Sequence, residues 1–246
     1  MAKGASIKFQ SYSESIPKLL SILNLQKELK KYDKIVLKPY LSGLGDHTPA
    51  EFTEQVLKFC IENKNPVAEI FIAEGADGSD TMELFQSLGY TALAEKYSIG
   101  LIDLNNTETE EIKDGFFLRF QEINFPKILS ESFVISIPRL FKNSDFDAIT
   151  SLSNMLGAFP SSHYSGFFYK NKNKIRKFPA KYVINDINRC KTPDFAVIDA
   201  SEQGAILAGL PLETDKQAVK LLGIDWKTIS YLKTIEENFP EAEHER

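Results

Sequence analysis

The chain has 246 residues, of which 43% are hydrophobic and 26% charged, and its formal net charge at pH 7 is -5. A chain of this length can bury a sizeable core, either as one large domain or as two packed lobes. The acidic balance argues against a general nucleic-acid binder, because neutralising a phosphate backbone needs a cationic face.

The cysteine content and the hydropathy of the chain further restrict the class of protein. Cys60 and Cys190 have no partner at metal-ligand spacing, which argues against a zinc knuckle or an iron–sulfur cluster held by this chain. Two isolated thiols fit a reducing compartment. Residues 1–10 lack the apolar core of a signal peptide, and no run is long and apolar enough to span a bilayer. We therefore expect a cytoplasmic protein with no membrane segment.

The first half of the chain alternates between helix-like and strand-like segments. Apolar residues at helical spacing predict a helix over 16–31. Short apolar runs predict a buried strand over 34–37 and further strands over 69–73 and 99–104. Helical segments separate these strands, and strand–helix–strand repeats with short loops imply parallel strands with right-handed crossovers.

Two helix starts carry capping signals. Thr48, followed by proline and Glu51, predicts a capped helix start with a capping box. Asp80 with Glu83 predicts another, and the helix that follows runs to about residue 97 with an interruption at Gly89. Both signals place a helix directly after a strand-end loop.

The second half is less regular. Residues 116–123 alternate without a clean polar face, which indicates an antiparallel or edge strand. Apolar runs predict strands over 133–138, 195–199 and 205–208. Helical spacing and end signals predict helices over 145–156, 180–190, 214–222 and 226–238.

These elements together predict an α/β fold, with a mostly parallel sheet and helices on both faces. We expect residues 1–246 to form a single α/β unit. The alternative is two packed lobes, formed by residues 1–110 and 111–240. The charged tail, residues 241–246, is expected to fray.

Charged residues follow the predicted strands, and the carboxyl ends of parallel strands share one edge of a sheet. The residues concerned are Lys38, Glu74, Asp103, Arg139, Lys142 and Asp199. The helix starts at Thr48 and Asp145 would open toward the same edge and offer backbone N–H groups. We therefore predict a phosphate or carboxylate site held by Lys38, Thr48, Arg139, Lys142, Asn154 and Asp199. The alternative is that these residues are solvated loop charges or salt-bridge partners.

Acid–base chemistry is assigned to His163, with Glu74 and Asp103. His163 follows the helix that carries Asn154, and it can titrate near neutral pH. His163 and His47 are equally compatible with plain surface histidines. The acidic residues are scattered over separate loops, which is weak support for a cation site, and we predict no dedicated metal centre.

One segment of the chain is basic, although the net charge of the chain is negative. Residues 167–177 combine aromatic side chains with a run of cations that includes Lys170, Lys172 and Lys174. Such a segment can bind single-stranded nucleic acid by stacking and phosphate contact, although a solvated linker is the commoner outcome.

Several motifs resemble, in order, those of the family called domain of unknown function 362 (DUF362). They are Lys38-Pro39 with Thr48-Pro49, residues 70–75, 85–90, 102–104, 136–140, 150–157, His163 and 193–200. The sequence departs from that pattern at Asn143, where the family usually has histidine, and at Ser153, where it usually has lysine. The ferredoxin-like iron–sulfur module of many members has no counterpart here.

The resemblance leaves two functions open. The first is a small-molecule enzyme or metabolite-binding protein whose ligand is a small anion. The second is a non-catalytic protein that docks to an electron-transfer partner, or to nucleic acid through the basic loop. The family pattern is also distantly similar to the N-terminal lobe of nickel-pincer lactate racemases. We predict no nickel cofactor, because Asn143 replaces the expected histidine, and the cofactor stays unassigned.

Overall fold

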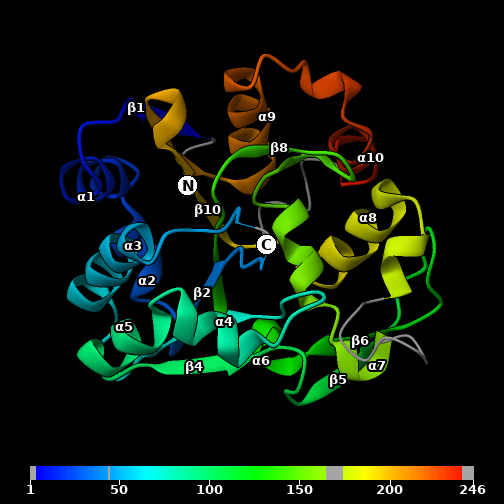
Figure 1. Cartoon of the computed structure of the whole chain (residues 1–246), viewed down its shortest axis with the longest axis horizontal. Coiled ribbons are helices and arrows are strands. Elements are labelled where there is room, and N and C mark those ends of the chain that lie inside the picture. Colours follow the sequence, from blue (N-terminus) through cyan, green and yellow to red (C-terminus); the bar gives the residue numbers. More distant parts are fainter. Residues whose placement is uncertain (1–3, 44, 165–173, 240–246) are drawn as a thin grey trace.

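The computed structural model describes residues 4–43, 45–164 and 174–239 (Figure 1). A seven-stranded sheet runs through the molecule in the order β1-β11-β10-β7-β2-β3-β4. Five neighbouring strands are parallel, namely β10 (Phe195–Ala200), β7 (Phe133–Ile137), β2 (Lys34–Pro39), β3 (Glu69–Glu74) and β4 (Gly100–Asp103). Two antiparallel strands, β11 (Ala205–Gly209) and β1 (Ala5–Lys8), extend the sheet at one end.

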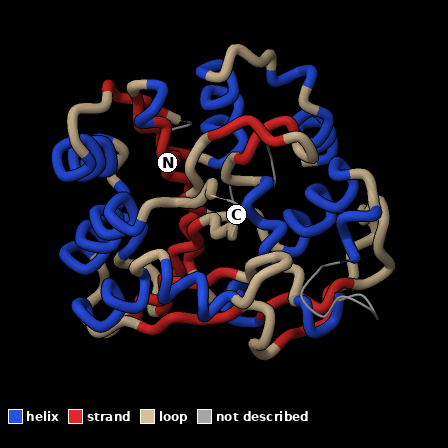
Figure 2. The backbone as a smooth tube through the Cα atoms, viewed as in Figure 1, coloured by secondary structure: helices blue, strands red, loops and turns tan. Residues whose placement is uncertain are grey.

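Helices cover both faces of the sheet (Figure 2). On one face, Ile35 and Leu37 of β2 share a core with α1 (Tyr12–Ile22), α2 (Leu25–Leu29), α3 (Ala50–Asn63), α4 (Thr81–Ser87) and α5 (Tyr90–Tyr97). On the other face, Val36 packs with the short 3-10 helix η1 (Ser153–Ala158) and with α8 (Ala180–Cys190). The α/β prediction is confirmed, and the side chains of β2 alternate between the faces because strand residues have a period of two.

The C-terminal helices form a further layer beside α8. Buried apolar residues of α9 (Pro211–Leu221) and α10 (Ser230–Asn238) share a core with Ile184 of α8. The predicted helices over 214–222 and 226–238 correspond to α9 and to η4 (Trp226–Thr228) followed by α10. The predicted tail, residues 241–246, lies outside the described residues.

The two capping predictions had different outcomes. The side chain of Asp80 accepts a hydrogen bond from the backbone N–H of Glu83, and Gly89, with a φ of 86°, separates α4 from α5, as predicted. The cap at Thr48 is wrong, because α3 begins at Ala50 without a side-chain cap. The Thr48 hydroxyl instead donates to the carbonyl of Ile137, at 2.9 Å, and ties this loop to β7.

The alternating segment 116–123 is not a strand over its length. The hairpin there is formed by β5 (Thr109–Ile112) and β6 (Ile123–Pro126), and α6 (Lys127–Ser130) follows it. The turns before β6 are held by the buried carboxylate of Asp186, which accepts the backbone N–H groups of three consecutive residues, Leu118, Arg119 and Phe120. A long-range contact from α8, which the local pattern does not contain, therefore decides the conformation.

The helix predicted over 145–156 is also wrong. Residues 141–149 form the hairpin of β8 (Phe141–Asn143) and β9 (Asp147–Ile149), and η1 follows after a turn. The side-chain oxygen of Asn143 accepts the N–H groups of Asp145 and Phe146, at 2.8 and 3.0 Å. Such a local bond to the backbone competes with helix formation, so no helix N-terminus exists at Asp145.

Short elements complete the described chain, namely α7 (Ser161–Tyr164), η2 (Lys174–Lys177) and η3 (Ser201–Gln203). Among the described residues, no helix has the length and hydropathy that crossing a membrane requires.

Candidate functional site

A cavity of about 890 Å³ lies at the carboxyl ends of β2 and β3. Its described walls come from the loop after β2, the glycine-containing loop 74–79 after β3, the β8–β9 hairpin, η1 and the start of α8. Open α/β proteins usually bind ligands at this edge of the sheet. The cavity is large enough for a metabolite.

A buried ion pair lies at this edge, where β2 and β3 end. The Nζ atom of Lys38 donates to Oε2 of Glu74 at 2.8 Å, and the two side chains are 0% and 3% exposed. Glu74 lines the cavity, whereas Lys38 is not among its lining residues. Lys38 also donates to the backbone oxygen of Asn154 at 2.6 Å. The lysine is thus anchored behind the carboxylate that faces the cavity.

Asn154, which also lines the cavity, fixes η1 against the sheet. Its Nδ2 atom donates to the backbone oxygen of Lys38 at 2.9 Å and to the hydroxyl of Ser136 at 3.0 Å. The hydroxyl of Ser136 in turn donates to the carbonyl of Ser151 at 2.9 Å. The amide therefore joins β2, β7 and the segment before η1, and its nitrogen is committed to these bonds.

Two glycines allow the main chain to approach Glu74 closely. A Cβ atom at Gly157 would lie 1.8 Å from Oε1 of Glu74 and 2.8 Å from Nζ of Lys38. A Cβ atom at Gly75 would lie 2.3 Å from the carbonyl oxygen of Gly157. Both distances are far below contact distance, so the packing of η1 over the carboxylate requires glycine at both positions.

Burial sets the protonation of the pair. Burial raises the pKa of Glu74, while Lys38 and the backbone N–H of Gly75 act in the opposite direction. Burial also lowers the pKa of Lys38, against the attraction of Glu74. Both shifts bring the charged and neutral forms of the pair closer in energy, because a low-dielectric site disfavours isolated charges. Such a carboxyl group is suited to exchanging a proton with a ligand.

A second buried carboxylate holds the segment that precedes η1 in the cavity wall. Asp215 of α9 is fully buried and accepts four hydrogen bonds, from the hydroxyls of Thr150 and Ser151 and from the backbone N–H groups of Ser151 and Leu152. Burial is the main cause that raises its pKa to about 6. Asp215 therefore fixes the turn at residues 150–152, which directly precedes η1 with Asn154 and Gly157.

The described lining of the cavity is acidic and aromatic. It includes the carboxylates of Glu74, Asp77 and Asp145 but no lysine, arginine or histidine, and it also contains the aromatic rings of Tyr40, Phe146, Phe159 and Phe178. Of the predicted site residues, Glu74 and Asn154 belong to this lining. The charge of the described lining is thus opposite to that of the predicted anion site.

The predicted cations lie elsewhere. Arg139 forms an ion pair with Glu202, and Lys142 of β8 is exposed. Neither is among the residues that line the cavity. The described cavity lining therefore does not bring Arg139 and Lys142 together with Glu74 and Asn154.

Asp199 points to the opposite face of the sheet. Its carboxylate accepts a hydrogen bond from the hydroxyl of Tyr12 on α1 at 2.9 Å, and burial raises the pKa of Tyr12 to about 12. The strand ends do share one edge, because Lys38 pairs with Ser136 in register and Arg139 forms a bridge with Asp199. The side chains nevertheless separate, because successive residues of a strand face opposite sides.

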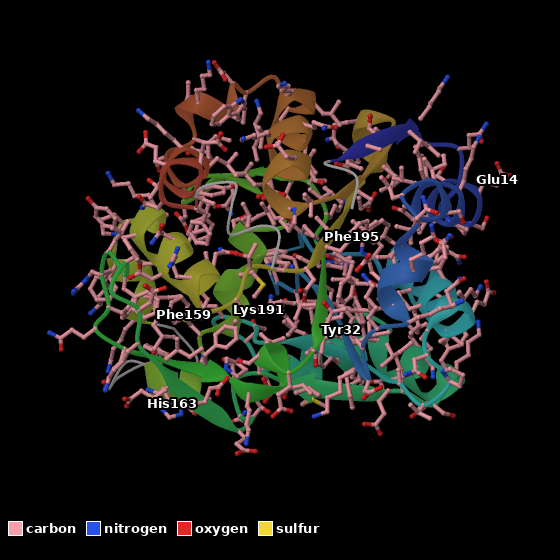
Figure 3. The ribbon with its side chains drawn as sticks, turned by 180° about the vertical axis from the view of Figure 1, so that it is seen from behind. Glu14, Tyr32, Phe159, His163, Lys191 and Phe195 are labelled. Carbon is pink, nitrogen blue, oxygen red and sulfur yellow. The ribbon has the colours of Figure 1, made fainter. Side chains whose placement is uncertain are left out.

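Asp103 and His163 make local contacts outside the cavity lining. Oδ1 of Asp103 accepts the backbone N–H of Asn105 at 2.9 Å, and Oδ2 accepts the side chain of Asn106. His163 on α7 is exposed at the lower margin of the molecule (Figure 3), and its Nε2 atom lies 3.3 Å from the hydroxyl of Thr109. Neither residue is part of the cavity lining.

Sequence reasoning missed Asn105, a buried side chain that joins three parts of the cavity wall. Its Nδ2 atom donates to the carbonyl of Ala76 and the hydroxyl of Thr81, and its Oδ1 atom accepts the N–H of Ser161. Its position two residues after a strand-end aspartate was the only local signal. A buried amide that connects loops far apart in the sequence is visible only in the folded chain.

Two further predictions concern metals and the basic loop. Within the described ranges, no group of three or more histidine, cysteine, aspartate or glutamate side chains is arranged to hold a metal ion. Lys170 and Lys172 of the basic loop lie outside the described residues, and Lys174, the first residue of η2, is exposed.

Comparison with known proteins gives a family and a fold. The family model described as "Domain of unknown function (DUF362)" matches residues 35–205. The lactate racemase apoprotein from Thermoanaerobacterium thermosaccharolyticum has a similar structure, with a TM-score of 0.62 and 13% sequence identity over 87% of this chain. A protein from Thermotoga maritima is similar with a TM-score of 0.55 and 15% identity over 86% of this chain. The chain spans 56% and 59% of the lengths of these two proteins, and no curated protein matches its sequence.

Proposed function

Since this chain belongs to the DUF362 family, we propose that it binds a small polar metabolite at the carboxyl edge of its sheet and that Glu74 exchanges a proton with this ligand. The observation that carries the proposal is a buried carboxylate which lines a cavity of about 890 Å³ while a buried lysine holds it from behind. The similarity to a lactate racemase apoprotein is one of fold and assigns no reaction.

The geometry of Glu74 favours proton transfer over a purely structural role. A structural ion pair needs no cavity beside it, whereas Glu74 lines one together with polar groups such as Ser153 and Ser161. Removing one partner of a buried pair is costly, so Lys38 keeps Glu74 in place through ligand exchange. The pair therefore combines a fixed position with access to a ligand.

The proposed step is proton transfer between Glu74 and an acidic C–H group of the ligand. The carboxylate of Glu74 takes the proton, and the electron pair remains on the ligand, on a carbonyl oxygen when the C–H group is next to a carbonyl. Lys38 keeps its hydrogen bond to Oε2 and stabilises the ionised carboxylate between transfers. Return of the proton to the same ligand would complete an exchange or an isomerisation.

The charge of the described lining favours neutral or cationic polar groups on the ligand. No cationic side chain of the described lining would attract a phosphate or carboxylate, and Asp145 would repel one. Aromatic rings can stack on a cation or on the apolar face of a sugar. The anion site expected from the sequence stays a prediction, and a ligand screen distinguishes the two.

A thermal-shift screen tests ligand binding. The panel contains polyols, sugars and amines on one side, and phosphorylated and carboxylated metabolites on the other. We expect stabilisation by a member of the first group, which vanishes in Glu74→Gln and persists in the control Glu202→Gln, because Glu202 lies outside the cavity. Stabilisation by phosphorylated compounds alone would favour the anion site instead.

Proton transfer is tested on the stabilising ligand. The ligand is incubated with the protein in D2O, and NMR follows the entry of deuterium at each ligand carbon. We expect exchange with the wild type and at least a hundredfold slower exchange with Glu74→Gln. Binding without any exchange would reduce the function to ligand binding alone.

A further inference from the structure

The β1 strand forms one edge of the sheet, far along the strand order from the cavity. Its one neighbour in the described sheet is β11, and Figure 1 draws it at the margin of the molecule beside α1. An edge strand presents a row of backbone N–H and C=O groups with no partner strand, which proteins commonly cover or charge. The edge of β1 is therefore a place where a further strand can add.

The register shows which backbone groups face outward. The N–H of Phe9 donates to the carbonyl of Gly204 at 2.8 Å, so residue 9 directs its backbone polar groups toward β11. Alternate residues of a strand direct these groups to opposite sides. Ala5 and Ile7 therefore share the direction of Phe9, whereas Ser6 and Lys8 direct their N–H and C=O groups away from the sheet.

A groove of about 270 Å³ runs between this edge and α1. Its apolar part includes Leu19 and Ile22, and Ile22 is 60% exposed, among the largest exposed hydrophobic side chains of the described residues. Lys8 and Lys18 are the charged residues of the described lining, which contains no carboxylate. The groove is thus apolar and positively charged, whereas the chain as a whole has a net charge of -5.

We propose that the β1 edge binds an extended, acidic peptide segment of a partner protein as an additional strand. The backbone of the segment bonds to the outward groups of Ser6 and Lys8, as in β-strand addition. The apolar side chains of the segment face Leu19 and Ile22 on the α1 side, and its carboxylates, which alternate with them, face the side of Lys8. Lys18 on α1 adds positive charge at the groove. Complementary charge selects this occupant over a basic or neutral strand.

Peptide binding tests the proposal. The probe is a fluorescein-labelled, amidated hexapeptide of alternating valine and glutamate, and its counterpart alternates valine and lysine. Fluorescence anisotropy at 50–100 mM salt is expected to give a dissociation constant at least tenfold lower for the acidic peptide, and this preference should weaken as salt is raised. Equal binding of the two peptides, or no binding of either, would overturn the proposal.

Two pairs of variants assign binding to this edge. Ser6→Pro removes an outward N–H and is compatible with an edge strand, so it should weaken binding of the acidic peptide at least tenfold, while Ser6→Ala should not. Lys18→Glu should weaken it at least fivefold, while the control Lys27→Glu should not, because Lys27 is an exposed residue of α2 outside the groove. The Lys18 pair keeps the test valid if Ser6→Pro fails to fold.

The other plausible occupant is a second copy of the chain, paired β1 to β1. Sedimentation velocity over a hundredfold concentration range detects it as a dimer that Ser6→Pro abolishes. A dimer of this kind, together with failure of the acidic peptide to bind, would overturn the assignment to a partner protein. A monomer that binds the acidic peptide supports it.

Discussion

Two buried carboxylates next to the same segment, residues 150–157, are stabilised in different ways. Glu74 has a lysine at 2.8 Å and lines the cavity, whereas Asp215 is held by four hydrogen-bond donors and is absent from the lining. Burial raises the pKa of both. Only Glu74 has a cation to offset that rise and a cavity from which a ligand can reach it.

The comparison shows that two buried carboxylates in one fold can have different surroundings and therefore different chemical properties. Asp215 orders a turn, and the turn places Asn154 and Gly157 around the Lys38–Glu74 pair. A carboxylate satisfied by backbone and hydroxyl donors is suited to fixing a loop. A carboxylate that faces one cation and one cavity is suited to chemistry, because its balance of charge changes when a ligand binds.

Removing the cation should have the largest effect. Lys38→Met leaves Glu74 buried without its partner, so we expect the free energy of unfolding at pH 7 to fall by about 3–5 kcal/mol. The double variant Lys38→Met/Glu74→Gln should recover a large part of this loss, because no unpaired charge remains. Urea denaturation measures both, and equal losses in the single and double variants would show that the ion pair is not the cause.

Asp215 should make stability depend on pH. Its pKa is about 6 in the folded protein, above the ordinary aspartate value of 3.8 that applies to the unfolded chain. The folded form therefore binds more protons between these values, and stability falls as pH rises through this window. The difference corresponds to about 3 kcal/mol at 1.36 kcal/mol per pH unit. In Asp215→Asn the unfolding free energy at pH 7 minus that at pH 3.5 should be more positive than in the wild type by about that amount, because this contribution is absent. Identical pH slopes in the wild type and the variant would contradict this role.

Filling the space above Glu74 should have an intermediate effect. Gly157→Ala places a methyl group at 1.8 Å from Oε1 of Glu74, and overpacking of this kind costs about 1–3 kcal/mol. Gly115→Ala is a matched control, because a Cβ atom there meets nothing within 4 Å. Thermal unfolding should separate the two variants by several degrees. Equal midpoints would mean that η1 moves away from the carboxylate without cost.

The smallest loss of stability is expected for the exposed ion pair between Arg139 and Glu202. Arg139 and Glu202 form an ion pair in which Glu202 is 61% exposed, and exposed pairs contribute about 0.2–1 kcal/mol. Glu202→Gln should therefore change the unfolding free energy by less than about 1 kcal/mol and should respond to salt. A loss comparable to that of Lys38→Met would place Arg139 among the buried charges and remove the contrast between the two strand ends.

Much of the fold follows from local pattern. The runs that form β2, β3, β7 and β10 are apolar and short, as buried parallel strands are. These runs and the edge strand β4 were predicted within one or two residues. The cap at Asp80 and the break at Gly89 were also local properties. The segment 145–156 was misassigned because its apolar spacing suits a helix, while the side chain of Asn143 favours a turn.

The sequence by itself determined the class of fold and the edge of the sheet where charged residues collect, because strand burial and strand direction are encoded in short patterns. Only the tertiary structure decided which of these charges meet. Lys38, Glu74 and Asn154 come together from three separate segments, whereas Asp199 and Arg139 form other contacts at the same edge. The physical reason is that the face to which each side chain points, and the glycines that admit the neighbouring main chain, depend on packing between segments far apart in the chain.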